Sequence, residues 1–167
     1  MVAAAPVQGL TADNALVIAR LLASLVVVAA LVTGCGVFVA PAQPTPGELT
    51  DIVNALVLRN MTITDQVAGD AGCSDSSIYS NAVRYDVSMA GETGSHPVFV
   101  FGWKSQATFD AAKAAFDACV ENYSLTNHVE SLYVLDDHAP WRAYGPGWPI
   151  GLRDAVNEAL VAAGGAP

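Results

Sequence analysis

The fold is decided by residues 83–101, which read VRYDVSMAGETGSHPVFVF. Apolar and polar residues alternate in the first part, the period-two pattern of a strand with one face in the core. Residues 91–95 combine glycine with small polar residues, a composition typical of a turn. Residues 97–101 return as a strand that is apolar on both faces. The stretch therefore predicts an antiparallel hairpin whose second strand lies near the centre of a sheet.

Periodicity predicts two further strands, three helices and a short helical turn outside this hairpin. The strands cover residues 61–67 and 129–135, and the turn covers residues 75–79. The first helix starts with the capping signal Thr45-Pro46-Gly47-Glu48 and ends at Asn60. The second starts at Ser105 and ends near Val120, and the third starts at Pro149 and ends at Gly164-Gly165. This order predicts an α+β domain, in which about three helices pack on one face of a small, four-stranded, largely antiparallel sheet.

Residues 21–40 read LLASLVVVAALVTGCGVFVA and contain no charged residue. A helix of that length spans roughly 30 Å, the thickness of a hydrocarbon core. Because Arg20 precedes the segment, the positive-inside rule places residues 1–20 in the cytoplasm. The sequence thus predicts a single-pass cell-membrane protein, with a proline-rich tether at 41–46 and an extracytoplasmic domain at 47–167.

Three interpretations of the apolar segment remain open. It can be an uncleaved transmembrane helix or signal anchor. It can be a lipoprotein signal, since Val32-Thr33-Gly34-Cys35 resembles a lipobox with Cys35 as the lipidated residue. It can also be a signal peptide cleaved after Ala42, since residues 40–42 fit the small-x-small pattern of a cleavage site. All three export residues 43–167.

Cys73 and Cys119 form an even pair in the exported part of the chain. In an oxidising compartment such a pair in one small domain predicts a disulfide. The competing interpretation is a thiol nucleophile or a metal site. Neither cysteine has a second Cys or a His at ligand spacing, so we expect the disulfide.

The chain of 167 residues is 53% hydrophobic and 14% charged, with a formal net charge of −9. The apolar content excludes wholesale disorder. Seven basic residues against sixteen acidic ones argue against nucleic acid or an anionic membrane surface as a partner. All nine net negative charges belong to the predicted exported domain.

Residues 136–149 combine two tryptophans with tyrosine, arginine and three prolines. Rigid aromatic side chains on a loop supply contact area at low entropic cost. We therefore identify Trp141, Arg142, Tyr144 and Trp148 as candidate ligand-binding residues. The alternative is that Trp141 and Trp148 cover the sheet where the last helix joins it.

Asp136, Asp137 and His138 are candidate metal ligands, since carboxylate and imidazole groups suit divalent ions. The alternative is a solvated acidic strand end, because adjacent residues on a strand point to opposite sides. The chain contains neither a Gly-x-Ser-x-Gly motif nor a phosphate-binding loop with its lysine. The sequence predicts no catalytic residue and no cofactor.

These observations predict a membrane-tethered, extracytoplasmic, non-catalytic domain that binds a protein or small-molecule partner. Two alternatives stay open. One is an exported metal-dependent enzyme that uses Asp136, Asp137 and His138. The other is an accessory subunit of an envelope complex.

Overall fold

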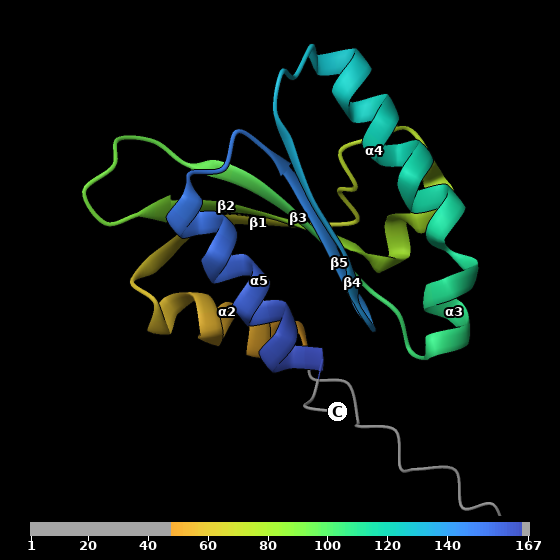
Figure 1. Ribbon diagram of the computed structural model, residues 1–167, viewed down its shortest axis with the longest axis horizontal. Helices are drawn as coiled ribbons and strands as arrows, with labels where there is room; N and C mark the ends of the chain where they lie inside the picture. The colour runs from red at the N-terminus through yellow and green to blue at the C-terminus, as the bar shows by residue number, and fades with distance from the viewer. Residues whose placement is uncertain (1–47, 165–167) are drawn as a thin grey trace, which may run out of the picture. The chain divides into compact units, whose positions relative to one another are not determined.

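The computed structural model describes residues 48–164, which form an α+β domain (Figure 1). The predicted cytoplasmic segment, the membrane segment 21–40 with Cys35, the cleavage position at Ala42 and the tether 41–46 lie outside these residues. Within residues 48–164, no helix is long and apolar enough to cross a membrane. The elements are, in order, α2 (Leu49–Leu58), β1 (Met61–Ala68), the 3₁₀ helix η1 (Ser76–Asn81), β2 (Ala82–Met89), β3 (His96–Gly102), α3 (Gln106–Ala111), α4 (Lys113–Asn127), β4 (Leu132–His138), β5 (Trp141–Pro146) and α5 (Ile150–Gly164).

The sheet has five strands in the order β1-β2-β3-β5-β4, and every neighbouring pair is antiparallel. The predicted hairpin is present as β2 and β3, and β3 is the central strand as expected. The prediction of four strands is wrong, because residues 141–146 form β5 rather than a loop. Its sequence hides the strand, since residues 141–145 are buried on both faces and show no alternation of apolar and polar types.

Helices cover both faces of the sheet, which corrects the prediction that they pack on one face. Val98 and Val100 of β3 face one core with α2 and α5, whereas Phe99 and Phe101 face a second core with α3 and α4. Figure 1 shows the two helix pairs on opposite sides of the strands. A strand that helices cover on both faces needs apolar side chains on both faces, and β3 has them.

The helix starts follow local capping chemistry. Glu48 caps α2, and its backbone N–H donates to the Asp51 carboxylate at 2.8 Å. Ser105 caps α3 as predicted, with its side chain accepting from the Thr108 N–H. The predicted helix from Ser105 to Val120 is divided into α3 and α4 at Ala112. Asn60 lies at φ +60°, where α2 has just ended.

The predicted disulfide between Cys73 and Cys119 is present, with Cα atoms 5.3 Å apart. It joins the loop between β1 and η1 to α4. The loop therefore lies against the second core, where Ala71 is buried with Phe99 and Tyr144. This covalent link ties the loop to the middle of α4 and stabilises the fold.

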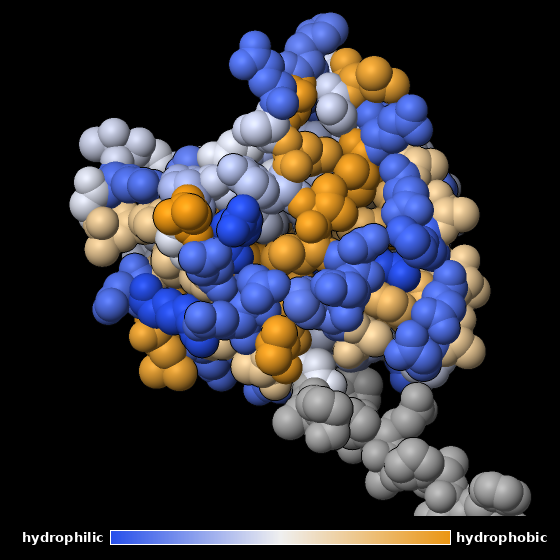
Figure 2. All heavy atoms as spheres, viewed as in Figure 1, coloured by the Kyte–Doolittle hydropathy of each residue, from blue (hydrophilic) through white to orange (hydrophobic). Residues whose placement is uncertain are grey.

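The face of the domain in Figure 2 carries many polar side chains, as the charge of the domain predicts. Figure 2 shows hydrophilic side chains over the outer faces of the helices and apolar side chains gathered between α4 and β4. Exposed large apolar residues on these two elements are Leu125 and Val134, at 69% and 40% exposure. Single exposed apolar residues are ordinary on soluble domains and identify no site by themselves.

Candidate binding cavity

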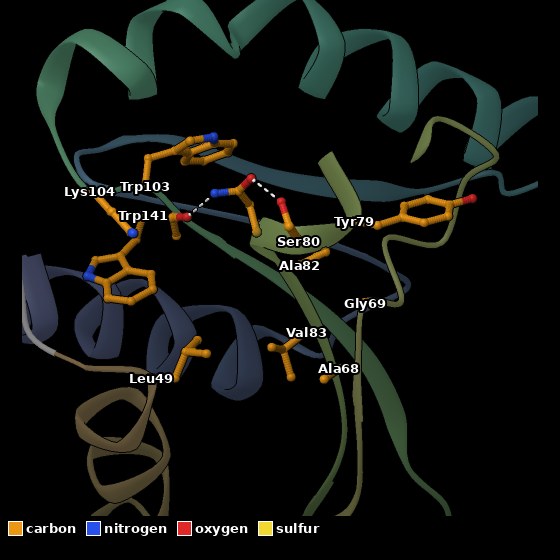
Figure 3. Close-up of a pocket in the computed structure, with 12 residues that line it drawn as sticks. Leu49, Ala68, Gly69, Tyr79, Ser80, Ala82, Val83, Trp103, Lys104 and Trp141 are labelled. Atoms are coloured by element: carbon orange, nitrogen blue, oxygen red, sulfur yellow. Dashed lines mark hydrogen bonds between the residues drawn. The ribbon is translucent and has the colours of Figure 1, made fainter. Parts of the chain in front are cut away.

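A cavity of about 760 Å³ opens at one end of the sheet (Figure 3). Antiparallel pairing brings the end of β1, the start of β2, the end of β3 and the start of β5 to this end of the sheet. The cavity is lined by Leu49 of α2, Ala68 and Gly69 after β1, Tyr79, Ser80 and Asn81 of η1, Ala82 and Val83 of β2, Gly102, Trp103 and Lys104 at the end of β3, and Trp141 of β5. Its volume lies within the range of small-molecule pockets, roughly 300–1,000 Å³.

Two tryptophans form the largest apolar walls of the cavity. Trp141 belongs to the core beneath α2 and α5, and Trp103 belongs to the core beneath α3 and α4. They are 5% and 7% exposed, so packing fixes both indoles in place. Figure 3 shows them on either side of the sheet end, with Leu49 and Val83 further along the wall. The cavity therefore lies where the two hydrophobic layers meet at the sheet end.

Gly102 makes the position of Trp141 possible. The two residues are partners in the β3–β5 register. A Cβ atom on Gly102 would overlap the six-membered ring of Trp141. The absence of a side chain thus lets the indole lie across β3, where it closes one side of the cavity.

The polar side chains of Tyr79, Ser80 and Asn81 at the cavity are each held by a hydrogen bond. The Asn81 side-chain amide donates to the Gly102 carbonyl oxygen at 2.8 Å, and the Ser80 hydroxyl donates to the Asn81 side-chain oxygen at 3.2 Å. The Tyr79 hydroxyl donates to the Cys73 carbonyl at 2.9 Å. A pocket with apolar walls and a few fixed polar groups is the usual arrangement of a ligand site.

Lys104 supplies the only charged side chain among the lining residues, and none of them is acidic. Within residues 48–164, no carboxylate lies within 4.0 Å of its ammonium group. The other lysines and arginines in this range that lie outside the core all have carboxylate neighbours: Arg59 with Glu158, Arg84 with Asp65, Asp70 and Asp86, Lys113 with Asp117 and Asp136, and Arg153 with Asp154. The cavity therefore carries a positive charge, that of Lys104, on a domain whose net charge is strongly negative.

Arg142 lies behind Trp103 in the second core and is 1% exposed. Its guanidinium carbon is 3.7 Å from the centre of the Phe109 ring and 5.1 Å from the Trp103 ring. Nη1 donates to the Phe109 carbonyl at 2.8 Å. Burial lowers the pKa of Arg142, and the carboxylates of Asp117, Asp136 and Asp110 oppose that shift. This arginine supports the wall that holds Trp103.

The four aromatic-segment candidates are all buried, and they do not form one surface. Trp141 lines the cavity, whereas Arg142 and Tyr144 face the second core and Trp148 packs beneath α5. The Tyr144 hydroxyl donates to the Ala71 carbonyl, and Trp148 Nε1 donates to the Pro97 carbonyl at 3.0 Å. Trp148 covers the sheet beneath α5, as the alternative describes, whereas Trp141 stays a candidate ligand-binding residue.

Two of the three candidate metal ligands contact other side chains, and the exposed Asp137 pairs only with His138 among residues 48–164. The Asp136 carboxylate lies 3.0 Å from Lys113, and His138 Nε2 lies 2.7 Å from the Asn157 side-chain oxygen and 3.2 Å from Asp137. In the part of the chain that the structure describes, no group of three or more His, Cys, Asp or Glu residues is placed to hold a metal ion. The metal-dependent enzyme gains no support from this geometry.

Comparison of the chain with protein-family models, with curated proteins and with solved structures finds no match. The geometry of the cavity is therefore the observation that bears on function.

Sequence reasoning identified Trp141 but missed Trp103, Lys104 and the η1 residues of the cavity. One available signal was the third tryptophan, which directly follows the central strand 97–101 and directly precedes Lys104. Loops after strands commonly carry binding residues. The pairing of Trp103 with Trp141 was not visible, because it depends on β5 joining β3.

Proposed function

We propose that this protein is a membrane-tethered extracytoplasmic domain that binds a small, largely apolar ligand in the cavity at the sheet end, without catalysis. The observation that carries the proposal is the cavity itself, with its two immobilised indoles and its few polar groups. Burial of apolar ligand surface against such walls supplies the binding free energy, at roughly 25 cal/mol per Å² before the costs of association.

The lining chemistry supports binding rather than reaction. Among the described residues around the cavity, the Ser80 hydroxyl hydrogen-bonds to Asn81 rather than to a base. None of the histidines is a lining residue. A nucleophile without a neighbouring general base stays weakly reactive.

The proposed location outside the cytoplasm rests on two features. The uncharged segment 21–40 is long enough for a membrane span. The Cys73–Cys119 disulfide is typical of oxidising compartments. An accessory role in an envelope complex is compatible with this location, but no surface of the described residues identifies a protein partner.

The test uses the full chain in phosphatidylcholine vesicles and the uncharged dye N-phenyl-1-naphthylamine. All three tryptophans lie in the domain, and two line the cavity, so tryptophan-sensitised dye emission reports binding there. We expect saturable emission that is lost in Ala68→Phe, because Ala68 is an exposed lining residue whose enlargement fills the cavity. Empty vesicles give the background from dye in the lipid.

Thr62→Phe is the matched control, since Thr62 is also exposed on the edge strand β1 but lies at its other end. This variant should bind the dye like the wild type. Equal saturable emission from the wild type and Ala68→Phe, with both proteins folded by circular dichroism, would overturn the proposed function.

A further inference from the structure

We propose that the cavity selects an organic anion, with Lys104 binding the anionic group while the indoles hold the apolar body. The inference rests on the proposed function, since it names the class of ligand for the same cavity. It is carried by the distribution of charge around the cavity and by the position of one lysine.

The charge distribution singles out this cavity. Fifteen of the sixteen acidic residues lie within residues 48–164, yet none of these fifteen lines the cavity. Lys104 lacks a carboxylate partner within residues 48–164, in contrast to each of the other lysines and arginines there that lie outside the core. A lone ammonium group beside apolar walls attracts anions and repels cationic ligands. A ligand carboxylate, sulfonate or phosphate would supply a negative partner for the Lys104 ammonium group, which no carboxylate within residues 48–164 pairs with.

The position of Lys104 suits this role. It directly follows Trp103 at the end of β3, and its side chain is exposed. In the view of Figure 3 it lies between Trp103 and Trp141. An ammonium group offers three donors on a flexible stem, so it can reach an anionic group at the mouth while the ligand body stays against the indoles.

Asn81 can provide a second donor for the same group. Its amide nitrogen carries two hydrogens, and one of them bonds to the Gly102 carbonyl. That bond and the one accepted from Ser80 hold the amide plane in place. A fixed neutral donor beside a mobile cation is a suitable arrangement for an anion that carries more than one oxygen.

The volume favours a small molecule over a macromolecule. About 760 Å³ accommodates a drug-sized body. The overall charge of −9 opposes a polyanion or an anionic bilayer as the partner. The ligand is therefore an amphipathic organic anion, whether it arrives as a free acid or as a single lipid molecule.

The experiment compares two dyes that share one apolar body. 1-Anilinonaphthalene-8-sulfonate is the sulfonated form of N-phenyl-1-naphthylamine, so the pair isolates the contribution of the anionic group. Both are titrated against the full chain in phosphatidylcholine vesicles by tryptophan-sensitised emission. In the wild type we expect the sulfonate to bind saturably, with an affinity that decreases as salt is added.

The variants are Lys104→Gln, Lys104→Arg and Arg153→Gln. Because a hydrogen-bonded ion pair contributes to affinity, Lys104→Gln should weaken sulfonate binding roughly tenfold. It should leave the uncharged dye within about twofold, and Lys104→Arg should restore most of the sulfonate affinity. Arg153→Gln removes the same charge from an exposed position outside the cavity, so it should change neither dye.

Two outcomes overturn this inference while the proposed function stands. One is unchanged sulfonate affinity in Lys104→Gln, and the other is an equal loss in Arg153→Gln, which would show an effect of net charge alone. Failure of the uncharged dye to bind the cavity would instead overturn the proposed function. Replacement of exposed Lys104 should leave the unfolding midpoint unchanged, which separates lost binding from lost folding.

Discussion

Gly102 and Trp141 face each other across the β3–β5 pair, and the indole occupies the space that a Gly102 side chain would need. This close approach joins the central strand to the strand that sequence reasoning missed. It also fixes one wall of the cavity. The first prediction tests this relationship directly.

Gly102→Ala should lower the free energy of unfolding by about 1–3 kcal/mol, as overpacking in a core does. The added Cβ displaces the Trp141 ring, which is 5% exposed and packed in the core. Urea unfolding followed by circular dichroism measures the change. In a Trp141→Leu background the same substitution should cost clearly less, since the clashing ring is gone. Equal costs in both backgrounds would show that the two residues are not coupled.

Arg142 should contribute to stability through its packing as well as its charge. Arg142→Ala removes the stem and the guanidinium from beside Phe109 and Trp103, and we expect a loss of about 3 kcal/mol. Arg142→Met should lose less, because an unbranched apolar chain keeps much of the packing. The measurement is again the free energy of unfolding in urea.

Arg153→Met is the control for this pair of variants, since the Arg153 side chain is 45% exposed. It should change stability by no more than about 0.5 kcal/mol. If Arg142→Met costs as much as Arg142→Ala, the hydrogen bonds to the Phe109 and Asp136 carbonyls, rather than packing, dominate the contribution.

The disulfide should be a major source of stability. Cys73 and Cys119 are 46 positions apart, and closing a loop of that length stabilises a fold by roughly 4 kcal/mol in the chain-entropy model. Cys73→Ala/Cys119→Ala should therefore unfold at a much lower urea concentration than the oxidised wild type. Adding a reductant should destabilise the wild type and leave the double variant unchanged. A reductant effect on both proteins would point to another cause.

Stability should decrease at alkaline pH because of buried tyrosines. Burial raises the pKa of both Tyr85 and Tyr144. In the unfolded chain these two tyrosines ionise near pH 10, at a lower pH than in the folded protein. The stabilisation is therefore complete below about pH 10 and is lost as the pH rises through the folded pKa values. Urea unfolding between pH 8 and about pH 11 measures this slope.

Two phenylalanine variants measure the contribution of each buried tyrosine to stability separately. The Tyr85 hydroxyl is buried without a hydrogen-bond partner among residues 48–164, so Tyr85→Phe should keep or increase stability at neutral pH. Tyr144→Phe should lose about 1 kcal/mol with its bond to Ala71. Both should show a shallower alkaline slope than the wild type. An unchanged slope in both would assign the pH dependence to other groups.

Sequence reasoning performed well where the signal is local. The alternation in residues 83–89, the cap at Ser105 and the apolar stripe of the last helix each depend on neighbours within one or two turns or strand steps. It failed for β5 because a strand buried on both faces has no alternation, and because Pro140, Pro146 and Gly147 resemble loop composition.

The amino-acid pattern alone predicts the α+β class, the central hairpin, the cysteine pairing and the charge of the domain. These follow from periodicity, capping and counting, which need no knowledge of distant contacts. Only the tertiary structure decided that β5 lies between β3 and β4. That insertion buries Arg142, Tyr144 and Trp148, and it brings Trp141 to Gly102, Trp103 and Lys104. The cavity exists because segments remote in the chain meet at one sheet end, and such meetings are set by the packing of the whole domain.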